Sequence, residues 1–411
     1  MYLAERHIVN KNNPNWESID KLCLLSKNLY NQSLFLIKQE YEKSGRFLRY
    51  NELEKISKNQ IEKYNDYYKL TASVSQQVLQ VFDKNINCFL KLIKLWKKDK
   101  TKLNGCPQFP KYKDKTKGRN IVVFTNQVAR LKSGFIYFPK KNNLLPIKTI
   151  LKNEEKIKEI RIIPQSNNYV IEIIYEQKEK ELKPNNNNYL SIDLGLNNLA
   201  TCYDTKNNKS FIINGKPIKS DNQYFNKIKA KEQSQLKKNH NKYTSKKLER
   251  LSNKRSNKIS DYLHKSSRII VDYCLNNEIN TLIIGYNKEW KQKINIGKVN
   301  NQKFVNIPHS KFLFMLKYKC QLEGINFIEN EESYTSKCSS LDNEKICKHE
   351  NYLGRRVKRG LYISNKGILI NADLNGSINI LRKVIGETLE LDSNETINRG
   401  YVLYPKKILS F

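Results

Sequence analysis

Residues 189–200 read YLSIDLGLNNLA, and this stretch decides the fold of the second half of the chain. Its first part, Tyr189–Asp193, is an apolar run that ends in a carboxylate, which is typical of a buried strand. Gly195 follows shortly after Asp193 and allows a backbone or a ligand to approach closely. An aspartate at a strand end can cap a turn, or it can be one of several carboxylates that share a site.

The segments after Asp193 alternate between predicted strands and helices. A long basic helical segment is expected from Tyr224 to Asn276, and a final helix begins near Ala372. The other predicted elements are the strands Leu199–Tyr203, Ser210–Asn214, Thr281–Gly285 and Ile325–Glu329 and the helix Ser310–Gly324. This succession is the order of the ribonuclease H-like fold. There the sheet order is 3-2-1-4-5 with strands 1, 4 and 5 parallel, so their carboxyl ends lie side by side.

The first half of the chain predicts a helical bundle followed by a β-barrel. From Asn15 to about Leu95, apolar residues recur at spacings of three and four, as in amphipathic helices. Leu3 to Val9 is expected to supply one more strand to the barrel. The barrel strands predicted after the bundle are Asn120–Thr125, Gly134–Phe138, Ile157–Ile163 and Tyr169–Tyr175. The polar run Glu176–Asn188 then marks the main boundary between the two halves.

Charge and composition restrict the partners. The chain of 411 residues has 75 Lys+Arg against 40 Asp+Glu, a net charge of +35. Self-repulsion of this size points to a polyanionic partner, and nucleic acid is the leading candidate. The sequence contains no apolar run of about 18 residues, so no membrane association is expected. Its eight cysteines are scattered without a disulfide framework, as expected of reduced thiols in the cytosol.

A second candidate carboxylate lies in residues 371–381, which read NADLNGSINIL. Asp373 is expected at the start of the final helix, whose apolar positions Leu374, Ile378 and Leu381 would pack on the sheet. An aspartate in a first helical turn also interacts favourably with the helix dipole, so alone it does not indicate a site.

Together, these two segments and the strand–helix series between them resemble the TnpB family, whose nuclease domain is RuvC-like. The block 283–382 is similar to that family as well, including GYNKEWKQ at 285–292, ESYTSK at 332–337 and RVKRGL at 356–361. In the first half the resemblance rests on domain order, basicity and FPKYK at 109–113. It implies an RNA-guided DNA endonuclease of a transposon, working in the bacterial cytoplasm at the nucleoid.

The resemblance implies a multidomain chain with α/β, all-β and all-α parts. The C-terminal domain would be ribonuclease H-like (RuvC), and the N-terminal β-barrel would contain an inserted helical bundle. The expected domains are a first barrel strand at 1–13, a helical recognition bundle at 14–105, the rest of the barrel at 106–180, a linker at 181–188, the nuclease domain at 189–390 with a degenerate zinc-ribbon insertion at about 335–371, and a tail at 391–411.

One acidic residue departs from the family pattern. Most relatives carry a glutamate at the end of strand 4, where this sequence has Gly285. Some members resemble this sequence in having it further along, three residues before a Thr-Ser pair, which here is Glu332. Strand 5 neighbours strand 4, so the origin of the side chain moves by about 4.8 Å, one strand spacing. Glu331 and Glu289 are alternatives, because loop register is not fixed by sequence. A further alternative is that Glu331 and Glu332 are only solvated charges at the end of a strand.

The expected catalytic residues and metal ligands are therefore Asp193, Glu332 and Asp373. Carboxylate oxygens suit Mg²⁺ or Mn²⁺. Two such ions about 3.5–4 Å apart would activate a water and stabilise the leaving oxygen of a phosphodiester. Zinc is not expected, because the cysteine pairs of the relatives are reduced here to Cys338, Cys347 and His349, and a structural zinc site needs four ligands.

The implied partners are a guide RNA from the transposon end and a double-stranded target DNA with a short adjacent motif. An A-form heteroduplex needs a basic channel, which the net charge of +35 fits. Glutamine can pair with adenine, and lysine with guanine or phosphate. The candidate motif readers are Ser75, Gln76, Gln77, Gln80 and Lys111. A merely solvated helix face is the alternative for these positions.

Two other functions remain open at this point. A nuclease-inactive, RNA-guided DNA-binding repressor is suggested by Gly285 and the missing cysteines, although retention of both Asp193 and Asp373 argues against it. A DNA transposase without guide RNA is the second. The sequence does not distinguish a monomer from a dimer.

Overall fold

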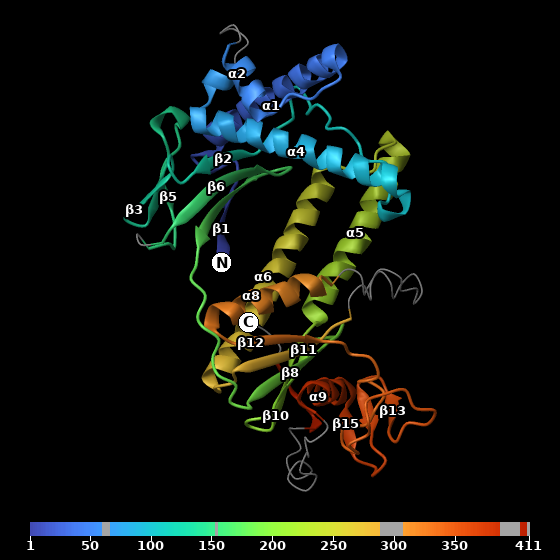
Figure 1. Cartoon of the computed structure of the whole chain (residues 1–411). Helices are drawn as coiled ribbons and strands as arrows, with labels where there is room; N and C mark the ends of the chain where they lie inside the picture. Colours follow the sequence, from blue (N-terminus) through green and yellow to red (C-terminus); the bar gives the residue numbers. More distant parts are fainter. Residues whose placement is uncertain (60–65, 153–154, 288–306, 387–402, 409–411) are drawn as a thin grey trace. The chain divides into compact units, whose positions relative to one another are not determined.

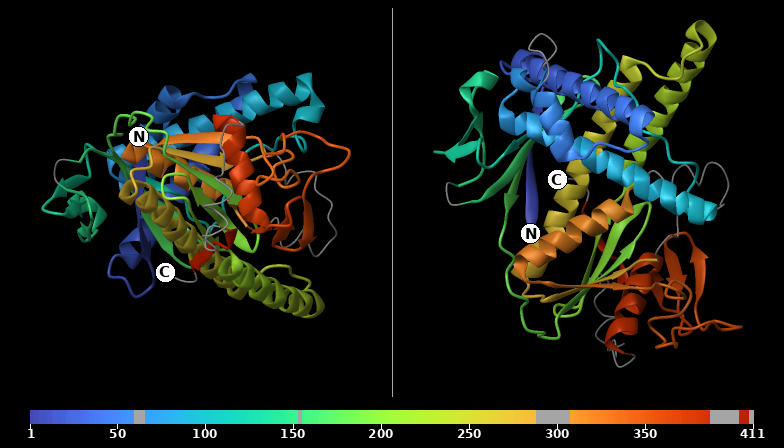
Figure 2. Two further views of the ribbon diagram at one scale, coloured as in Figure 1. Left: turned by 90° about the horizontal axis from the view of Figure 1, so that it is seen from below. Right: turned by 45° about the horizontal axis from the view of Figure 1, so that its top comes forward.

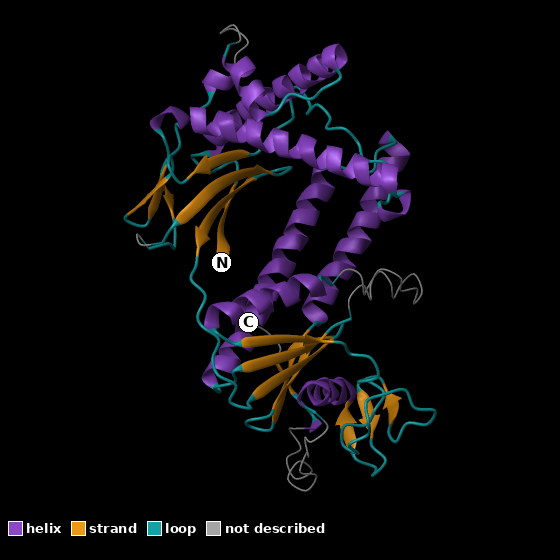
Figure 3. Cartoon of the chain, in the orientation of Figure 1, coloured by secondary structure: helices purple, strands orange, loops and turns teal. Residues whose placement is uncertain are grey.

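The computed structural model describes residues 1–59, 66–152, 155–287, 307–386 and 403–408. The chain divides into two compact units, Met1–Gln177 and Lys178–Phe411, and the division falls inside the polar run predicted as a boundary. Each unit combines helices with sheets of its own (Figure 3). The protein is therefore a mixed helix-and-sheet, multidomain chain. No helix within the described ranges is both long enough and apolar enough to span a bilayer.

The helical part of the first unit follows the predicted apolar spacing. Its helices are α1 (Trp16–Ser44), α2 (Tyr50–Lys58), α3 (Asp66–Lys69) and α4 (Ala72–Lys98), with the short 3₁₀ turns η2 (Lys100–Lys102) and η3 (Lys140–Asn142). Leu22 and Leu29 of α1 and Val78 and Phe82 of α4 are buried in one core. Gly45 ends α1 in a left-handed conformation, with φ of 71°. The predicted bundle is confirmed.

The strands of the first unit form two antiparallel sheets. One has the order β1-β7-β6-β2, built from β1 (Tyr2–Val9), β7 (Tyr169–Glu176), β6 (Ile157–Pro164) and β2 (Val122–Thr125). The other has the order β3-β4-β5, built from β3 (Arg130–Lys132), β4 (Phe135–Tyr137) and β5 (Ile147–Lys148). The expected barrel is thus corrected to open sheets, with β1 and β2 as the two ends of the larger one in the described structure. The helical bundle packs against the larger sheet and buries its apolar side chains, since Phe124 of β2 and Val78 of α4 belong to one core.

The second unit is built on a six-stranded sheet with the order β12-β11-β8-β9-β10-β16. Its strands are β8 (Tyr189–Leu194), β9 (Asn198–Asp204), β10 (Lys209–Asn214), β11 (Thr281–Gly285), β12 (Asn326–Asn330) and β16 (Lys406–Ile408). Numbered along the chain, the first five have the predicted order 3-2-1-4-5, and β8, β11 and β12 are parallel as predicted. The strand β16, parallel to β10, was expected to be part of a tail.

Helices cover both faces of this sheet. They are α5 (Lys216–His240), α6 (Lys246–Asn276), α8 (His309–Glu323) and α9 (Ala372–Ile385). Figure 1 shows α9 on one face and α6 with α8 on the other. The alternation along β8 explains this, because Leu190 and Ile192 belong to the core that contains α6 and α8, whereas Ser191 hydrogen-bonds to Ser377 of α9. Side chains of β8 therefore alternate between the two helical layers.

The single basic helix expected from Tyr224 to Asn276 is corrected to two helices. α5 and α6 run side by side in each view of the chain (Figures 1 and 2). Asn241 ends α5 in a left-handed conformation, with φ of 47°. The Ser245 hydroxyl then caps α6 by accepting the Leu248 N–H at 3.3 Å. These two residues are local stop and start signals within an otherwise continuous basic pattern.

A small antiparallel sheet precedes α9. Its strands are β13 (Arg355–Lys358), β14 (Leu361–Ile363) and β15 (Leu369–Asn371), in the order β13-β14-β15. It belongs to the segment expected as a degenerate zinc ribbon. Because β15 runs directly into α9, this segment connects β12 to the helix that carries Asp373.

Candidate active site

The end of β8 places Asp193 at the edge where the parallel strands finish. The parallel register pairs Ile192 with Ile284 of β11, one residue before Asp193 and Gly285. Gly285 in turn pairs with Asn330 at the end of β12. The carboxyl ends of β8, β11 and β12 therefore lie side by side, as the sequence predicted, and side chains from all three can meet there.

Asp373 reaches the same edge from the first turn of α9. The side chain of Asn371 caps this helix by accepting the backbone N–H of Asp373 at 3.0 Å and of Leu374 at 3.2 Å. Because Asn371 caps the helix, the Asp373 carboxylate can contact other groups. It accepts a 2.7 Å hydrogen bond from Asn198 Nδ2 of β9 and lies 3.7 Å from the Arg356 guanidinium of β13.

Glu332 follows β12, and its carboxylate extends to the end of β11. Its Oε2 atom lies 3.1 Å from the point where a Cβ on Gly285 would be. Asn287 holds Glu332 from two sides, since its amide Nδ2 donates to Glu332 Oε1 at 3.3 Å and its Oδ1 accepts the Glu332 N–H at 3.2 Å. The carboxylate of Glu332, which follows β12, thus lies where the family pattern expects the carboxylate of a glutamate at the end of β11.

The other two acids act on the pKa of Asp193. Burial raises the pKa of Asp193 well above its usual value, and the carboxylates of Asp373 and Glu332 raise it further, while Arg356 acts in the opposite direction. Burial also raises the pKa of Glu332, and Glu331 adds to the effect, whereas Lys383 opposes it. The structure thus brings the predicted trio into one electrostatic neighbourhood. As they lie, however, no three Asp, Glu, His or Cys side chains of the described residues form a set that could hold a metal ion.

The two alternative glutamates differ from Glu332. Glu331 is exposed, forms a 2.8 Å ion pair with Lys383 and accepts a hydrogen bond from Ser333 Oγ. The Lys383 ammonium lowers the pKa of Glu331, so this carboxylate is already neutralised by a cation. Glu289 lies outside the described residues.

Gly376 of α9 was missed by the sequence prediction. A Cβ at this position would meet Asp193 Oδ2 at 3.0 Å and Asp193 Cγ at 3.4 Å. The missing side chain therefore lets the Asp193 carboxylate lie close to α9. A glycine inside a helical pattern weakens the helix and often has a packing reason, which was the available signal. Asn198, Asn287 and Arg356 were missed as well, because only the folded chain brings them to the acids.

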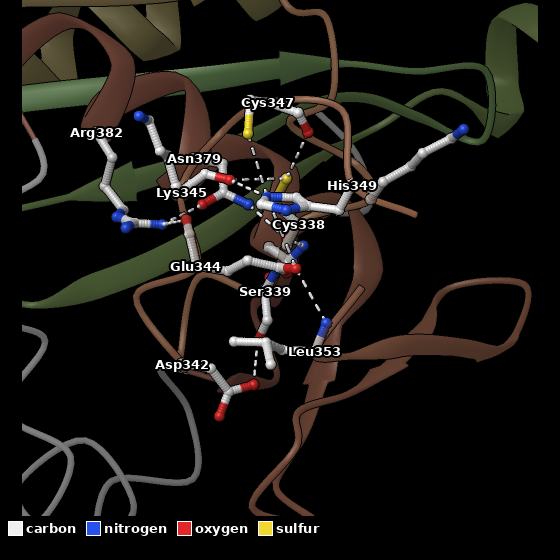
Figure 4. Close-up of polar contacts among 12 residues, drawn as sticks. Cys338, Ser339, Asp342, Glu344, Lys345, Cys347, His349, Leu353, Asn379 and Arg382 are labelled. Carbon is white, nitrogen blue, oxygen red and sulfur yellow. Dashed lines mark hydrogen bonds and ion pairs between the residues drawn. The ribbon is translucent and has the colours of Figure 1, made fainter. Parts of the chain in front are cut away.

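The segment expected as a degenerate zinc ribbon is held by hydrogen bonds (Figure 4). The Cys338 thiol donates to the carbonyl oxygens of Lys345 at 3.4 Å and Cys347 at 3.6 Å. His349 Nε2 lies 2.7 Å from the Lys345 carbonyl oxygen, which it can approach only as a donor. A ring nitrogen that carries a proton has no lone pair for a metal.

Glu344 is the centre of that segment. The side chain is buried, and its two oxygens accept the backbone N–H of Ser339 at 2.6 Å and of Leu353 at 2.9 Å. The Arg382 guanidinium of α9 also donates to the Glu344 carbonyl at 3.1 Å. Figure 4 shows these residues gathered around Cys338 and Asn379.

The candidate motif readers do not form one exposed set. Ser75 is fully buried, and its hydroxyl donates to the Tyr67 carbonyl at 2.6 Å, so it is corrected from a surface candidate to a core residue. Gln76 Nε2 donates to Glu54 at 3.1 Å. Gln77 and Gln80 are partly exposed and hydrogen-bond to each other at 3.1 Å, and Lys111 is exposed.

Two family models match the second half of the chain. Residues 172–291 match the OrfB_IS605 model, described as a probable transposase, and residues 309–380 match a Cas12f1-like TNB domain. Together these matches include the segments that carry Asp193, Glu332 and Asp373.

Two curated relatives match in sequence. One is a CRISPR-associated endodeoxyribonuclease Cas12f2 from a Micrarchaeota archaeon, which is 30% identical over 239 residues, 54% of this chain and 41% of the relative. The other is a TnpB-like protein, ORF457, from Acidianus two-tailed virus, which is 25% identical over 213 residues, 50% of this chain and 43% of the relative. The match thus spans about two fifths of the length of each relative.

Solved structures are similar only at a low level. A Cas12f1–sgRNA–target DNA complex aligns with a TM-score of 0.35 and 15% identity, covering 92% of this chain and 98% of that one. The mini RNA-guided endonuclease Cas-phi3 aligns with a TM-score of 0.45 and 11% identity, covering 94% and 93%. The sequence matches and motifs, and not these structures, are what link the chain to a family. By these matches, the chain is similar to TnpB-like proteins and their Cas12f relatives.

Proposed function

We propose that this protein is an RNA-guided DNA endonuclease of a transposable element, which cleaves phosphodiester bonds through Asp193, Glu332 and Asp373. The observation that carries the proposal is the grouping of these acids at one edge of the sheet, where Asp373 and Glu332 both raise the pKa of the partly buried Asp193. Three carboxylates gathered at one edge of the sheet repel one another, and cations relieve that repulsion. The strand order 3-2-1-4-5 supports a ribonuclease H-like (RuvC) assignment for the second unit.

The acids fit Mg²⁺ or Mn²⁺ by their chemistry, since all their potential ligand atoms are carboxylate oxygens. Asp193 of β8, Asp373 of α9 and Glu332 after β12 would hold the ions. The side chains of Asp373 and Glu332 hydrogen-bond to Asn198 and Asn287, so they would have to rotate to share the ions with Asp193. Bound ions would supply an activated water and stabilise the leaving oxygen.

Zinc is not part of the proposal. The Cys338 thiol donates to backbone carbonyls, and His349 Nε2 acts as a donor, so both groups already take part in hydrogen bonds within the segment. Both oxygens of Glu344 accept backbone N–H groups of the same segment. We infer that these hydrogen bonds perform the structural task of a zinc ion here.

Guide RNA and double-stranded DNA are the proposed partners. Lysine and arginine predominate over acidic residues in the sequences of both α5 and α6, and the whole chain carries a net charge of +35. Such charge favours phosphate backbones independently of sequence. Of the candidate motif readers, Gln76, Gln77, Gln80 and Lys111 are kept, because none of them is buried. The proposed place of action is the cytoplasm, at the nucleoid.

One experiment tests the proposal. The protein is purified together with the transcript that flanks its gene, and a plasmid library with randomised sequence beside the target is incubated with it in Mg²⁺ or in chelator. Guided, Mg²⁺-dependent cleavage is expected. Asp193→Ala and Asp373→Ala should abolish cleavage and leave guided binding near the wild-type level, because these residues would hold metal and not the heteroduplex. Tight guided binding without cleavage by the wild type would instead indicate a repressor, and cleavage of transposon ends without RNA would indicate a transposase.

A further inference from the structure

The helix α9 carries buried polar side chains that no step of the proposed cleavage uses. Ser377 and Asn379 follow Asp373 by four and six residues on the same helix. Both are fully buried, as are the groups they contact in strand β8 and in the turn after Glu332. A buried polar group is retained only when it is hydrogen-bonded, so the partners of these two side chains define their role.

Ser377 connects α9 to β8. Its hydroxyl donates to the Ser191 carbonyl at 3.0 Å, and the two serine hydroxyl oxygens lie 2.9 Å apart. Because the Ser377 proton is directed at the carbonyl, the Ser191 hydroxyl donates to Ser377 in return. Ser191 is two residues before Asp193. The hydrogen bonds between Ser191 and Ser377 therefore fix the position of α9 along β8 relative to Asp193.

Asn379 connects α9 to the turn after Glu332. Its Nδ2 atom donates to the carbonyl oxygens of Thr335 at 2.9 Å and Cys338 at 2.7 Å (Figure 4 shows Asn379 beside Cys338). The Thr335 hydroxyl in turn donates to the Glu332 carbonyl at 2.8 Å. Arg382 holds the Asn379 amide in this orientation by donating to its Oδ1 at 2.9 Å.

We propose that Ser377, and Asn379 acting through Thr335, are positioning residues, which set the spacing of Asp193 and Glu332 relative to Asp373 through buried hydrogen bonds of one helix. This inference rests on the proposed function, since it assumes that the three acids share metal ions. Mg²⁺ requires near-ideal octahedral geometry. A loss of spacing should therefore weaken metal binding even where the fold is kept.

The two connections are tested by small changes. Thr335→Val keeps the size of the side chain and removes the hydroxyl that binds the Glu332 carbonyl, and Thr335→Ser restores that hydroxyl. Ser377→Ala removes the connection to Ser191. Its matched control is Ser266→Ala, which removes an equally buried helical serine whose hydroxyl donates to the Tyr262 carbonyl at 2.7 Å, on α6.

The readout is Mn²⁺ affinity of the full chain, measured by electron paramagnetic resonance, with Asp193→Ala defining the signal from the site. We expect Thr335→Val and Ser377→Ala to weaken Mn²⁺ binding by about 10- to 100-fold, the usual effect of removing a residue that orients a metal ligand. Thr335→Ser and Ser266→Ala should stay within twofold of wild type. In the cleavage assay, the first two variants should lose more activity in Mg²⁺ than in Mn²⁺.

Three results would overturn the inference. If the wild type binds Mn²⁺ at this site and Thr335→Val and Ser377→Ala bind it equally well, the positioning role is wrong and the proposed metal centre stands. If both variants lose affinity only as much as Ser266→Ala, the bonds are merely structural, and the positioning role is again wrong. A wild type that binds no Mn²⁺ at this site overturns the metal centre and the positioning role together.

Discussion

Glu332 and Gly285 meet at the end of β11, where Glu332 Oε2 lies 3.1 Å from the position of a Cβ on Gly285. The backbone of Glu332 follows the neighbouring strand, β12, yet its carboxylate reaches the end of β11. A side chain on residue 285 would also meet Ile380, whose Cδ1 atom is 2.4 Å from the same point. Gly285 therefore leaves room for both Glu332 and Ile380, and this relationship allows the acidic group to originate from a different strand.

The variant Glu332→Gln is expected to lower Mg²⁺-dependent cleavage by orders of magnitude. The amide keeps the size of the side chain and removes the charge that would offset the metal. Single-turnover cleavage of a guided target measures the effect. Glu331→Gln is the matched control and should be mild, because Glu331 is exposed and already paired with Lys383. If Glu332→Gln cleaves normally and Glu331→Gln is inactive, then Glu331 and not Glu332 is the catalytic glutamate.

A glutamate returned to position 285 should rescue that variant only when Ile380 is shortened. In the Glu332→Gln background, Gly285→Glu alone is expected to recover little activity, because its Cβ would lie 2.4 Å from Ile380 Cδ1. Adding Ile380→Ala removes the obstructing atoms and should raise the cleavage rate further. Equal rates with and without Ile380→Ala would contradict the packing that we describe.

The Asp193 carboxyl should make the stability of the protein depend on pH. Its pKa in the folded chain is raised well above the ordinary 3.8, so the folded state binds this proton more tightly than the unfolded state. Ionisation of Asp193 therefore opposes folding, and its effect on the free energy of unfolding becomes more unfavourable as pH rises from 3.8 to the raised pKa.

Asp193→Asn removes this effect. Urea unfolding of both proteins in chelator, over a series of pH values, should give equal stabilities at the acidic end and a variant that is increasingly more stable toward neutral pH. A stability difference that does not change with pH would mean that the environment of Asp193 is not as described.

Local patterns predicted much of this site. The apolar run that ends in Asp193 identified a strand, and the succession of strands and helices predicted the sheet order that is observed. Asp193 and Asp373 could be chosen because each lies at the end or the start of a recognisable element. The convergence of Glu332 on Gly285 required a resemblance, because sequence alone does not give the distance that a side chain spans between neighbouring strands.

Other features were outside the reach of local patterns or were read incorrectly from them. The approach of Asp193 to Gly376 depends on how α9 is rotated against the sheet. Ser75, in contrast, could have been assigned correctly, because Val78, Leu79 and Phe82 follow it at spacings of three, four and seven. That spacing places Ser75 on the apolar side of α4. The open sheets were not predicted either, because the sequence pattern of a strand does not specify the strand with which it pairs.

The segment that contains Cys338 and Cys347 should be stable without zinc. Elemental analysis after dialysis is expected to find far less than one zinc per chain, and a chelator should leave the melting temperature unchanged. Glu344→Ala should lower the free energy of unfolding by about 1.5–3 kcal/mol for each of the two charged hydrogen bonds that it removes. Glu350→Ala, an exposed glutamate of the same segment, is the control and should have little effect. One tightly bound zinc per chain would overturn this account.

Gly376→Ala should separate stability from activity. Alanine inside a helix is favoured over glycine by about 0.5–1 kcal/mol, so α9 itself should not be weakened. The new Cβ would lie 3.0 Å from Asp193 Oδ2, however, a distance that forces the carboxylate to move by a few tenths of an ångström. We expect cleavage in Mg²⁺ to fall by about tenfold or more, with unchanged guided DNA binding and a melting temperature no lower than that of wild type. A variant that melts earlier and cuts normally would show that Gly376 serves the packing of α9 and not the placement of Asp193.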